Sequence, residues 1–314
     1  MVLSTALLPS STSLLWINKR FRVYLGLMDF TTNAIVWFDY GIFVISDPNI
    51  DIQISSKTIS IKGLDKMCLL NGDISGQLSS KLLITAGTPI DSAIKATVTT
   101  LGLETKVLIE THDYNTPYDI EKDVGTTVWD VVSELNNLYM DWQSFYDTKG
   151  YFVFNKIRNK LNDPIIWDFT DKDFRLSGNN QINYSNIRNN FIIYGKLLDS
   201  GVQIVSSKEL TISNSPTSPF NTTAMDKRTW VVKDDRLFTQ EQCDERLNYE
   251  IWKHTNFNEK ISFSCVPIYF LSINDLIYIN DVSSGIIGTY CINSITVPLK
   301  NSDSMNIGAY KIYA

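Results

Sequence analysis

Residues 125–155 show the clearest alternation of hydrophobic and polar positions in the chain. Their apolar side chains recur at spacings of three and four, at Val128, Val131, Val132, Leu135, Leu138 and Tyr139. This period predicts a helix with one apolar face, and Thr127 followed by Asp130 is an acidic variant of the capping box that starts helices. A turn cluster at residues 147–150 and an aromatic, β-branched run at 151–154 predict that this helix folds back onto a strand.

Strand patterns fill the region before this helix, in residues 16–70. The segments rich in aromatic and β-branched residues are 21–27, 34–46, 50–55 and 58–64. Clusters of turn-forming residues at 29–33 and 47–49 lie between them. This spacing predicts an antiparallel meander or a small barrel.

Residues 81–155 combine helix patterns with strand patterns. Thr88 and Pro89 open a segment with proline at the first helical position, and Gly102 supplies its stop. Residues 107–110 are typical of a strand. Together with residues 125–155, these segments predict a small α/β module.

Strand patterns return after residue 158, at 165–170, 191–196, 201–213, 261–270, 275–281, 287–299 and 309–313. Thr239 and Gln242 match a capping box and predict one helix near residues 240–254. Residues 214–225 are rich in proline and polar side chains and predict a long exposed loop.

The order of these elements predicts an α+β fold that is dominated by β structure. Two barrel-like antiparallel β domains would flank the α/β module. The predicted boundaries are residues 1–80 for the first β domain, 81–158 for the module, and 159–314 for the second β-rich domain.

Composition narrows the class of protein. The 314 residues are 44% hydrophobic and 20% charged, which is typical of a globular chain and excludes a disordered one. The net charge of −6 disfavours a general nucleic-acid binder, which would show a basic face. The N-terminus lacks a basic region before its apolar residues, and no apolar run reaches the roughly 18 residues of a membrane span. We therefore expect a soluble protein assembled in the cytoplasm.

The residues that most often bind metals are too scattered to predict a metal site. The four cysteines, Cys68, Cys243, Cys265 and Cys291, form no CxxC pair, and we interpret them as reduced, half-buried thiols. His112 and His254 lack an HxH or HExxH partner. His254 falls on the apolar side of its predicted helix, near the C-terminal end, where a structural role is expected. We predict no cofactor and no metal.

Paired carboxylates are the remaining catalytic possibility. Asp119, Glu121 and Asp123 form an acidic triplet that lacks the glycine and terminal glutamate of an EF-hand loop, so a solvated loop is the favoured interpretation. A cell-wall hydrolase could use Asp119, Glu121 or Glu134. No nucleotide-binding glycine motif and no GxSxG motif is present.

Aromatic residues gather in two places and suggest interfaces. The candidate interface residues are Trp37, Phe38, Phe43, Trp142, Phe145 and Tyr146. Exposed aromatic side chains can anchor a partner protein or stack on sugars, and buried ones pack a core. A protein–protein interface, a glycan-binding surface and core packing all stay open at this point.

Several of these segments together resemble the tail-hub family of tailed bacteriophages. The resemblance lies in a basic strand before Gly26, a G-x-F-x-I strand at residues 41–45, a strand ending in D-x-M-x-x-L at 65–70, and a G-Y-F-x-F strand at 150–154. Residues 183–196 extend it. None of these motifs is catalytic, and they span most of the chain.

The resemblance implies a structural, non-enzymatic protein of the virion tail tip or baseplate. Three copies, each with two tube-forming β domains, would form a ring that joins the tail tube or distal tail protein to a spike or tail lysin. DNA would pass through the lumen without specific recognition, which an acidic chain would suit. About fifteen residues precede the basic strand, so we expect the first barrel to be reduced or completed by a neighbouring chain.

Overall fold

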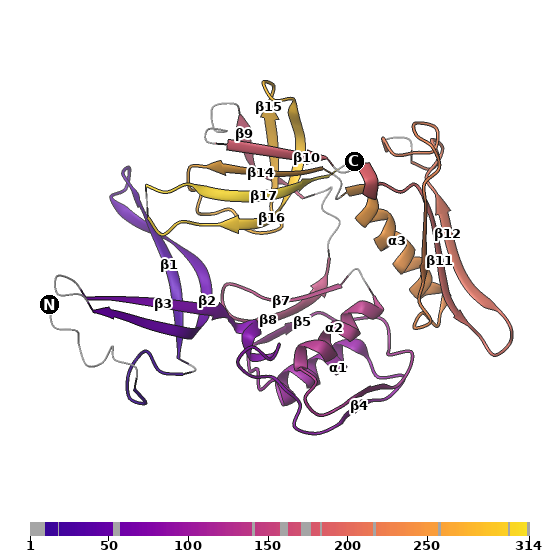
Figure 1. Cartoon of the computed structure of the whole chain (residues 1–314), viewed down its shortest axis with the longest axis horizontal. Helices are drawn as coiled ribbons and strands as arrows, with labels where there is room; N and C mark the ends of the chain where they lie inside the picture. The colour runs from indigo at the N-terminus through magenta and orange to yellow at the C-terminus, as the bar shows by residue number, and fades with distance from the viewer. Residues whose placement is uncertain are drawn as a thin grey trace. The chain divides into compact units, whose positions relative to one another are not determined.

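The computed structural model divides into two units, Met1–Leu138 with Trp142–Lys156, and Tyr139–Asp141 with Ile157–Ala314 (Figure 1). The residues that it describes are 10–17, 19–52, 57–139, 142–157, 163–170, 177–182, 184–215, 218–256, 259–300 and 302–312. We call the two parts unit 1 and unit 2 and describe each by itself.

Unit 1 begins with an antiparallel meander, which we call the N-terminal sheet. Its strands are β1 (Arg20–Asp29), β2 (Ala34–Ile52) and β3 (Lys57–Asp65), in the order β1-β2-β3. The predicted meander is confirmed, but the turn predicted at residues 47–49 is wrong, because β2 runs through it with only a register shift. Pro48 is tolerated there since β1 pairs with β2 only as far as Val44, which leaves Pro48 on a sheet edge.

The rest of unit 1 is the α/β module. Its elements are a 3₁₀ helix (Lys66–Leu69), β4 (Leu82–Ile84), α1 (Ile90–Ala96) continued by a π-helix (Thr97–Leu101), β5 (Val107–Ile109), β6 (Ile120–Lys122), α2 (Val128–Leu138), β7 (Trp142–Tyr146) and β8 (Phe152–Lys156). The sheets have the orders β4-β6 and β5-β8-β7. Ile94, Val131 and Phe152 are fully buried and belong to the module core.

The polypeptide after α2 differs from the prediction. The helix does not lead directly into the turn at residues 147–150; β7 comes between them and pairs with β8 in a hairpin. The helix α2 ends at Leu138, one residue before the last apolar position of the predicted face, Tyr139, and the aromatic residues that follow favour a strand. Pro89 also differs, because it caps α1 and precedes its first helical residue.

The capping box of α2 gives a first testable prediction. Thr127 Oγ1 accepts from the backbone N of Asp130 (3.0 Å), and Asp130 Oδ2 accepts from the backbone N of Thr127 (3.0 Å). Thr127→Ala removes one side of this exchange and should lower the free energy of unfolding by about 1 kcal/mol in urea denaturation. Thr126→Ala is the matched control and should change it less; equal losses would contradict the role of the box.

The same box sets a pH dependence. Hydrogen bonds from Thr127 lower the pKa of Asp130 from its ordinary value of 3.8. Because the pKa of Asp130 is lower in the folded state than in the unfolded chain, its carboxylate stabilises the folded state above the ordinary pKa of 3.8. This stabilisation is lost as the pH falls through the folded pKa. The difference between the wild-type chain and Thr127→Ala should therefore shrink below about pH 3.8.

Unit 2 contains a six-stranded sheet of order β10-β14-β17-β16-β15-β9. The strands are β9 (Ile165–Thr170), β10 (Ser177–Ile182), β14 (Glu259–Cys265), β15 (Leu276–Asp281), β16 (Ile286–Thr296) and β17 (Met305–Lys311). Its core includes Phe169, Phe263 and Tyr290. The β-dominated α+β class is confirmed, and no sheet in the described ranges closes into a barrel.

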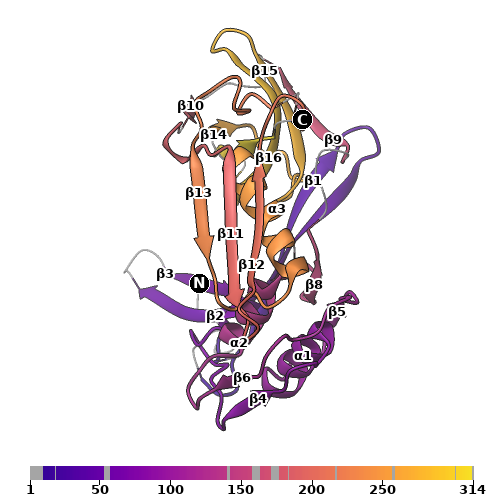
Figure 2. The ribbon, with the colours of Figure 1, turned by 90° about the vertical axis from the view of Figure 1, so that its right-hand side faces the viewer.

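The rest of unit 2 is a three-stranded sheet with a helix on one face (Figure 2). Strands β11 (Asn190–Leu197), β12 (Gln203–Glu209) and β13 (Thr229–Lys233) have the order β12-β11-β13. The predicted helix is α3 (Gln240–Asn256), and its capping box is present: Thr239 N donates to Gln242 Oε1 (3.1 Å). The predicted loop at residues 214–225 is only partly exposed in its described part, and Phe220 and Asn221 are buried.

All four cysteines are buried and unpaired to one another. Burial raises the pKa of the Cys68, Cys243 and Cys265 thiols to about 11. They therefore act as small hydrophobic side chains in the cores of both units.

Candidate assembly interface

The turn between β1 and β2 shows why this hairpin forms where it does. Asp29 Oδ1 accepts from the backbone N of Thr31 (2.8 Å), and Asp29 Oδ2 accepts from Thr32 Oγ1 (2.7 Å). Asn33 adopts a φ of 54°, in the left-handed region that asparagine tolerates. The predicted turn at residues 29–33 is thus confirmed.

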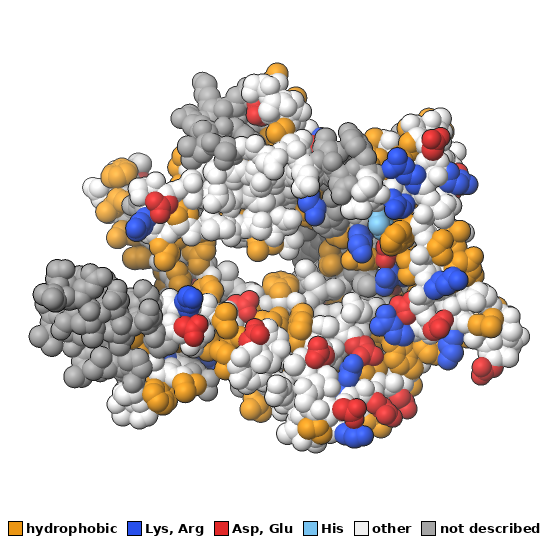
Figure 3. Space-filling model, in the orientation of Figure 1, with side chains coloured by type: hydrophobic (Ala, Val, Ile, Leu, Met, Phe, Trp, Pro, Cys, Tyr) orange, Lys and Arg blue, Asp and Glu red, His pale blue; other side chains and the backbone are white. Residues whose placement is uncertain are grey.

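The end of this hairpin exposes large apolar side chains, visible as hydrophobic atoms over the hairpin in Figure 3. We call them the hairpin patch, and their exposure lies between 45% and 88%: Tyr24, Leu27, Met28, Phe30, Ile35, Val36 and Trp37. Contiguous exposed apolar surface of this kind is typical of an interaction site.

The hairpin patch occupies both faces of the ribbon. Leu27 pairs with Val36, and the next pair, Met28 with Ile35, points to the opposite face because side chains alternate along strands. Trp37 lies on this second face over Gly26, where an added Cβ would come within 3.0 Å of the indole ring. A ribbon that is apolar on both faces needs cover on both sides.

The edges of the hairpin are also open. In the part of the chain that the structure describes, no strand pairs with the outer edge of β1, and β3 begins its pairing with β2 only at Phe43. Residues 34–37 of β2 therefore have β1 on one side and no described strand on the other. Free edges of this length are templates for a further strand.

The sequence-predicted interface residues fall on two strands of unit 1. On β2, Trp37 is 63% exposed, whereas Phe38 and Phe43 are half-buried. Phe43 stacks on Phe21 with ring centroids 5.7 Å apart, and this stack lies against Gly63, where a Cβ would be 2.5 Å from the Phe21 ring.

The other three predicted residues lie on β7. Trp142 stacks on Phe154 (4.7 Å between centroids) and contacts the tilted ring of His112 (4.3 Å), so it packs within the module. Phe145 is 36% exposed. Tyr146 is half-buried and its hydroxyl donates to Glu104.

Sequence reasoning missed most of the hairpin patch. It singled out aromatic residues and passed over Leu27, Met28, Phe30 and Val36. The signal was present in the pattern, because a half-buried strand alternates apolar and polar residues, whereas residues 35–38 are apolar at every position.

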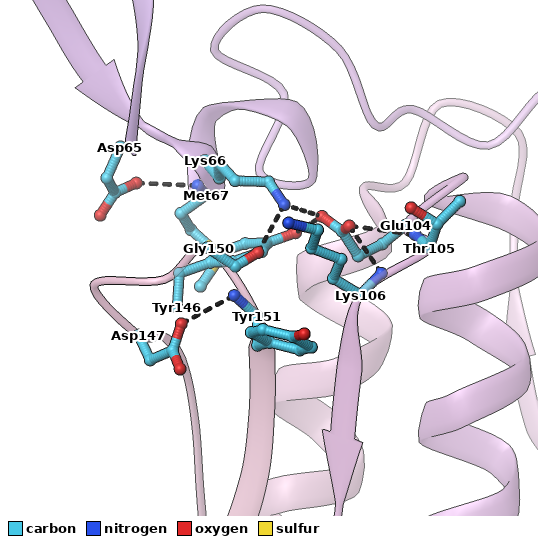
Figure 4. Close-up of polar contacts among 10 residues, drawn as sticks. All are labelled: Asp65, Lys66, Met67, Glu104, Thr105, Lys106, Tyr146, Asp147, Gly150 and Tyr151. Atoms are coloured by element: carbon cyan, nitrogen blue, oxygen red, sulfur yellow. Dashed lines mark hydrogen bonds and ion pairs between the residues drawn. The ribbon is translucent and has the colours of Figure 1, made fainter. Parts of the chain in front are cut away.

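A buried ion pair lies within the module, at the residue that follows the end of β3 (Figure 4). Lys66 Nζ lies 2.5 Å from Glu104 Oε2 and donates to Gly150 O (2.8 Å). The Glu104 carboxylate also accepts from Tyr146 Oη (2.9 Å) and from the backbone N of Thr105 (3.0 Å). Both side chains of the ion pair are almost fully buried.

The electrostatics of this pair follow from its burial. Burial alone would raise the pKa of Glu104, but hydrogen bonds from Lys66, the Lys106 backbone and Tyr146 outweigh it and lower that pKa. Burial lowers the pKa of Lys66, and pairing with Glu104 offsets only part of this effect. Glu104 is held ionised by its neighbours.

The carboxylates considered for hydrolysis contact different partners. Asp119 Oδ1 accepts from Ala86 N (2.7 Å), Asp123 pairs with Lys81 (3.2 Å), and Glu134 pairs with Lys122. Glu121 is exposed on β6. Within the described ranges, no three His, Cys, Asp or Glu side chains are grouped closely enough to hold a metal ion.

The two histidines have structural contacts. His112 Nδ1 accepts from Tyr114 N (3.0 Å) in unit 1. In unit 2, His254 lies in the last turn of α3 with its Nδ1 2.8 Å from Asn186 O and its ring beside Trp230. Among the described helices, none is long and apolar enough to cross a membrane.

Comparison with known proteins was informative only at the level of structure. No protein-family model matches the chain, and no curated protein matches it in sequence. The tail protein from Neisseria meningitidis MC58 is similar, with a TM-score of 0.63 and 12% identity over 93% of this chain and 87% of that one.

Two prophage proteins are also similar. The 43 kDa tail protein of prophage MuSo2 from Shewanella oneidensis has a TM-score of 0.61 and 12% identity over 93% of this chain and 88% of its own. The prophage tail protein gp18 from Listeria monocytogenes EGD-e has a TM-score of 0.52 and 13% identity, over 95% and 86%. The chain therefore has the fold of these phage tail proteins, and its resemblance to the tail-hub family is confirmed at the level of the fold.

Proposed function

We propose that this chain is a structural hub of a phage or phage-like tail, in which three copies form a ring that joins the tail tube to the spike or other tip proteins. The observation that supports this most directly is the β1–β2 hairpin, which is apolar on both faces and open along its edges. A two-stranded ribbon of this kind is marginally stable in water, so a partner is needed to cover it.

Sister copies supply that cover in the proposed ring. The hairpin of one copy would pair with strands of the next, in a head-to-tail contact that closes after three copies. The six-stranded sheet also ends in edge strands, β9 and β10, and Ile165 and Ile166 of β9 are exposed. The two barrel-like β domains would be complete only in the ring, where few free edges remain.

The remaining parts of the proposal follow from this role. The protein has no catalysis of its own, binds the tail tube or distal tail protein on one side and a spike or tail lysin on the other, and resides in the virion tail tip after assembly in the host cytoplasm. DNA passes through the ring without specific recognition. The α/β module supports the ring from outside.

The mass of the purified chain in solution tests the proposal. Analytical ultracentrifugation over a range of concentrations should show a species of three times the 35.7 kDa of one chain. Electron microscopy of that species should show rings. A monomer at all concentrations, both alone and mixed with tail-tube and spike proteins, would overturn the proposed ring.

Glycan binding is a second candidate, supported by one observation. The exposed Trp37 indole could stack on a sugar ring. The hub proposal expects no saccharide preference on a glycan array, whereas selective binding that is lost in Trp37→Ala would favour the glycan-binding function.

A further inference from the structure

A pocket of about 270 Å³ lies beside the buried ion pair of unit 1. Four cationic side chains line it, together with the carboxylate of Glu104: Arg20, Arg22, Lys66 and Lys106. This excess of positive charge stands out in a chain whose net charge is −6.

Two of the four cations are matched by carboxylates. Lys66 pairs with Glu104, whose oxygens are already occupied by Tyr146 and by backbone N–H groups. Arg22 pairs with Asp39, with Nη2 and Oδ2 2.7 Å apart and Nε donating to Oδ1 (3.2 Å). Each oxygen of Glu104 already accepts two contacts, and both oxygens of Asp39 contact Arg22.

The other two cations are not matched. Within the described ranges, Arg20 and Lys106 form no ion pair with a carboxylate, and the Lys106 ammonium group contacts only the face of Tyr151, 5.5 Å from the ring centroid. Burial is the main cause that lowers the pKa of Lys66, and the charges of Arg20 and Lys106 lower it further. Arg20 and Lys106 are therefore both near enough to Lys66 to repel its charge.

We propose that this pocket binds a compact oxyanion, a carboxylate or phosphate group, between Arg20 and Lys106. A guanidinium group offers a planar fork of donors that matches either anion with two parallel hydrogen bonds, and an ammonium group adds a point charge. The pocket volume is about nine times the ≈30 Å³ that one water molecule occupies in the liquid. A carboxylate or phosphate group therefore fits, together with several atoms of the molecule that carries it. Figure 4 shows Lys66 and Lys106 near the Glu104 carboxylate, and dashed lines join that carboxylate to the Lys66 ammonium group and to the backbone N of Lys106.

Isothermal titration calorimetry of the full chain with inorganic phosphate and, separately, with succinate tests this site. One anion should bind per chain, and Arg20→Ala with Lys106→Ala should weaken binding at least about tenfold, because each removed charge-assisted contact is among the stronger hydrogen bonds. The matched control is Lys19→Ala with Lys62→Ala. It removes the same charge from exposed lysines that do not line the pocket and should change the dissociation constant less than about twofold.

The two probes also separate the possible ligands. Binding of phosphate alone assigns a phosphate-bearing ligand, and binding of succinate alone assigns a carboxylate; both results support the site. The site would be overturned if neither phosphate nor succinate binds, or if the control pair weakens binding as much as Arg20→Ala with Lys106→Ala does. Both double variants change exposed side chains only, and unchanged melting temperatures without anion would show that their folds are intact.

Discussion

Replacing Trp37 or Leu27 by glutamate should prevent the chain from forming rings. The two residues lie on opposite faces of the β1–β2 hairpin, and each would place a charge without a partner in a contact that excludes water. Central apolar contacts of interfaces are each worth on the order of 3 kcal/mol when removed. The dissociation constant of the assembly should therefore rise roughly a hundredfold for each variant, measured by sedimentation across a concentration series.

A matched control separates assembly from general surface effects. Val124 is 60% exposed, similar to Trp37, but lies in a turn of the α/β module. Val124→Glu should leave the sedimentation profile unchanged. If both hairpin variants assemble as the wild-type chain does, the hairpin patch is not the contact between copies.

The second large effect is expected at the buried ion pair. Lys66→Met leaves the Glu104 carboxylate buried without its cation, and breaking such a pair typically costs about 3–5 kcal/mol. Gly150 O also loses its hydrogen bond from Lys66. The free energy of unfolding of unit 1 should fall by this amount, measured by urea denaturation together with hydrogen exchange of peptides from β8.

Two further variants establish the cause. Lys66→Met with Glu104→Gln removes both charges and keeps an acceptor for Tyr146, so it should recover most of the loss. Lys122→Met breaks the pair with Glu134, whose two side chains are 21% and 23% exposed, and should cost less than about 1 kcal/mol. If Lys66→Met and Lys122→Met lower the free energy of unfolding equally, burial does not increase the cost of breaking the ion pair.

Local sequence signals were sufficient for the helices and many of the strands. The capping boxes at Thr127 and Thr239 act over three residues, and both α2 and α3 start where they predict. Strand β7 was missed because its aromatic residues follow the helix without a breaking glycine or proline. Strand β13 was missed because it is a five-residue segment flanked by charged residues.

Contacts between distant residues could not be predicted in the same way. Lys66 reaches Gly150 across 84 residues, and in sequence both Lys66 and Glu104 look like ordinary surface charges. Trp37 and Trp142 look alike in sequence, yet Trp37 is exposed and Trp142 packs against His112 and Phe154. The burial of an aromatic side chain on a strand depends on which segments pack beside that strand, and the local sequence does not specify those segments.

The buried cysteines have a practical consequence. A thiol whose pKa is about 11 is ionised in roughly one molecule in ten thousand at pH 7, and the thiolate is the reactive form. Cys68, Cys243 and Cys265 are therefore slow to react with air, peroxide or alkylating reagents. Burial alone shields the fourth thiol, that of Cys291.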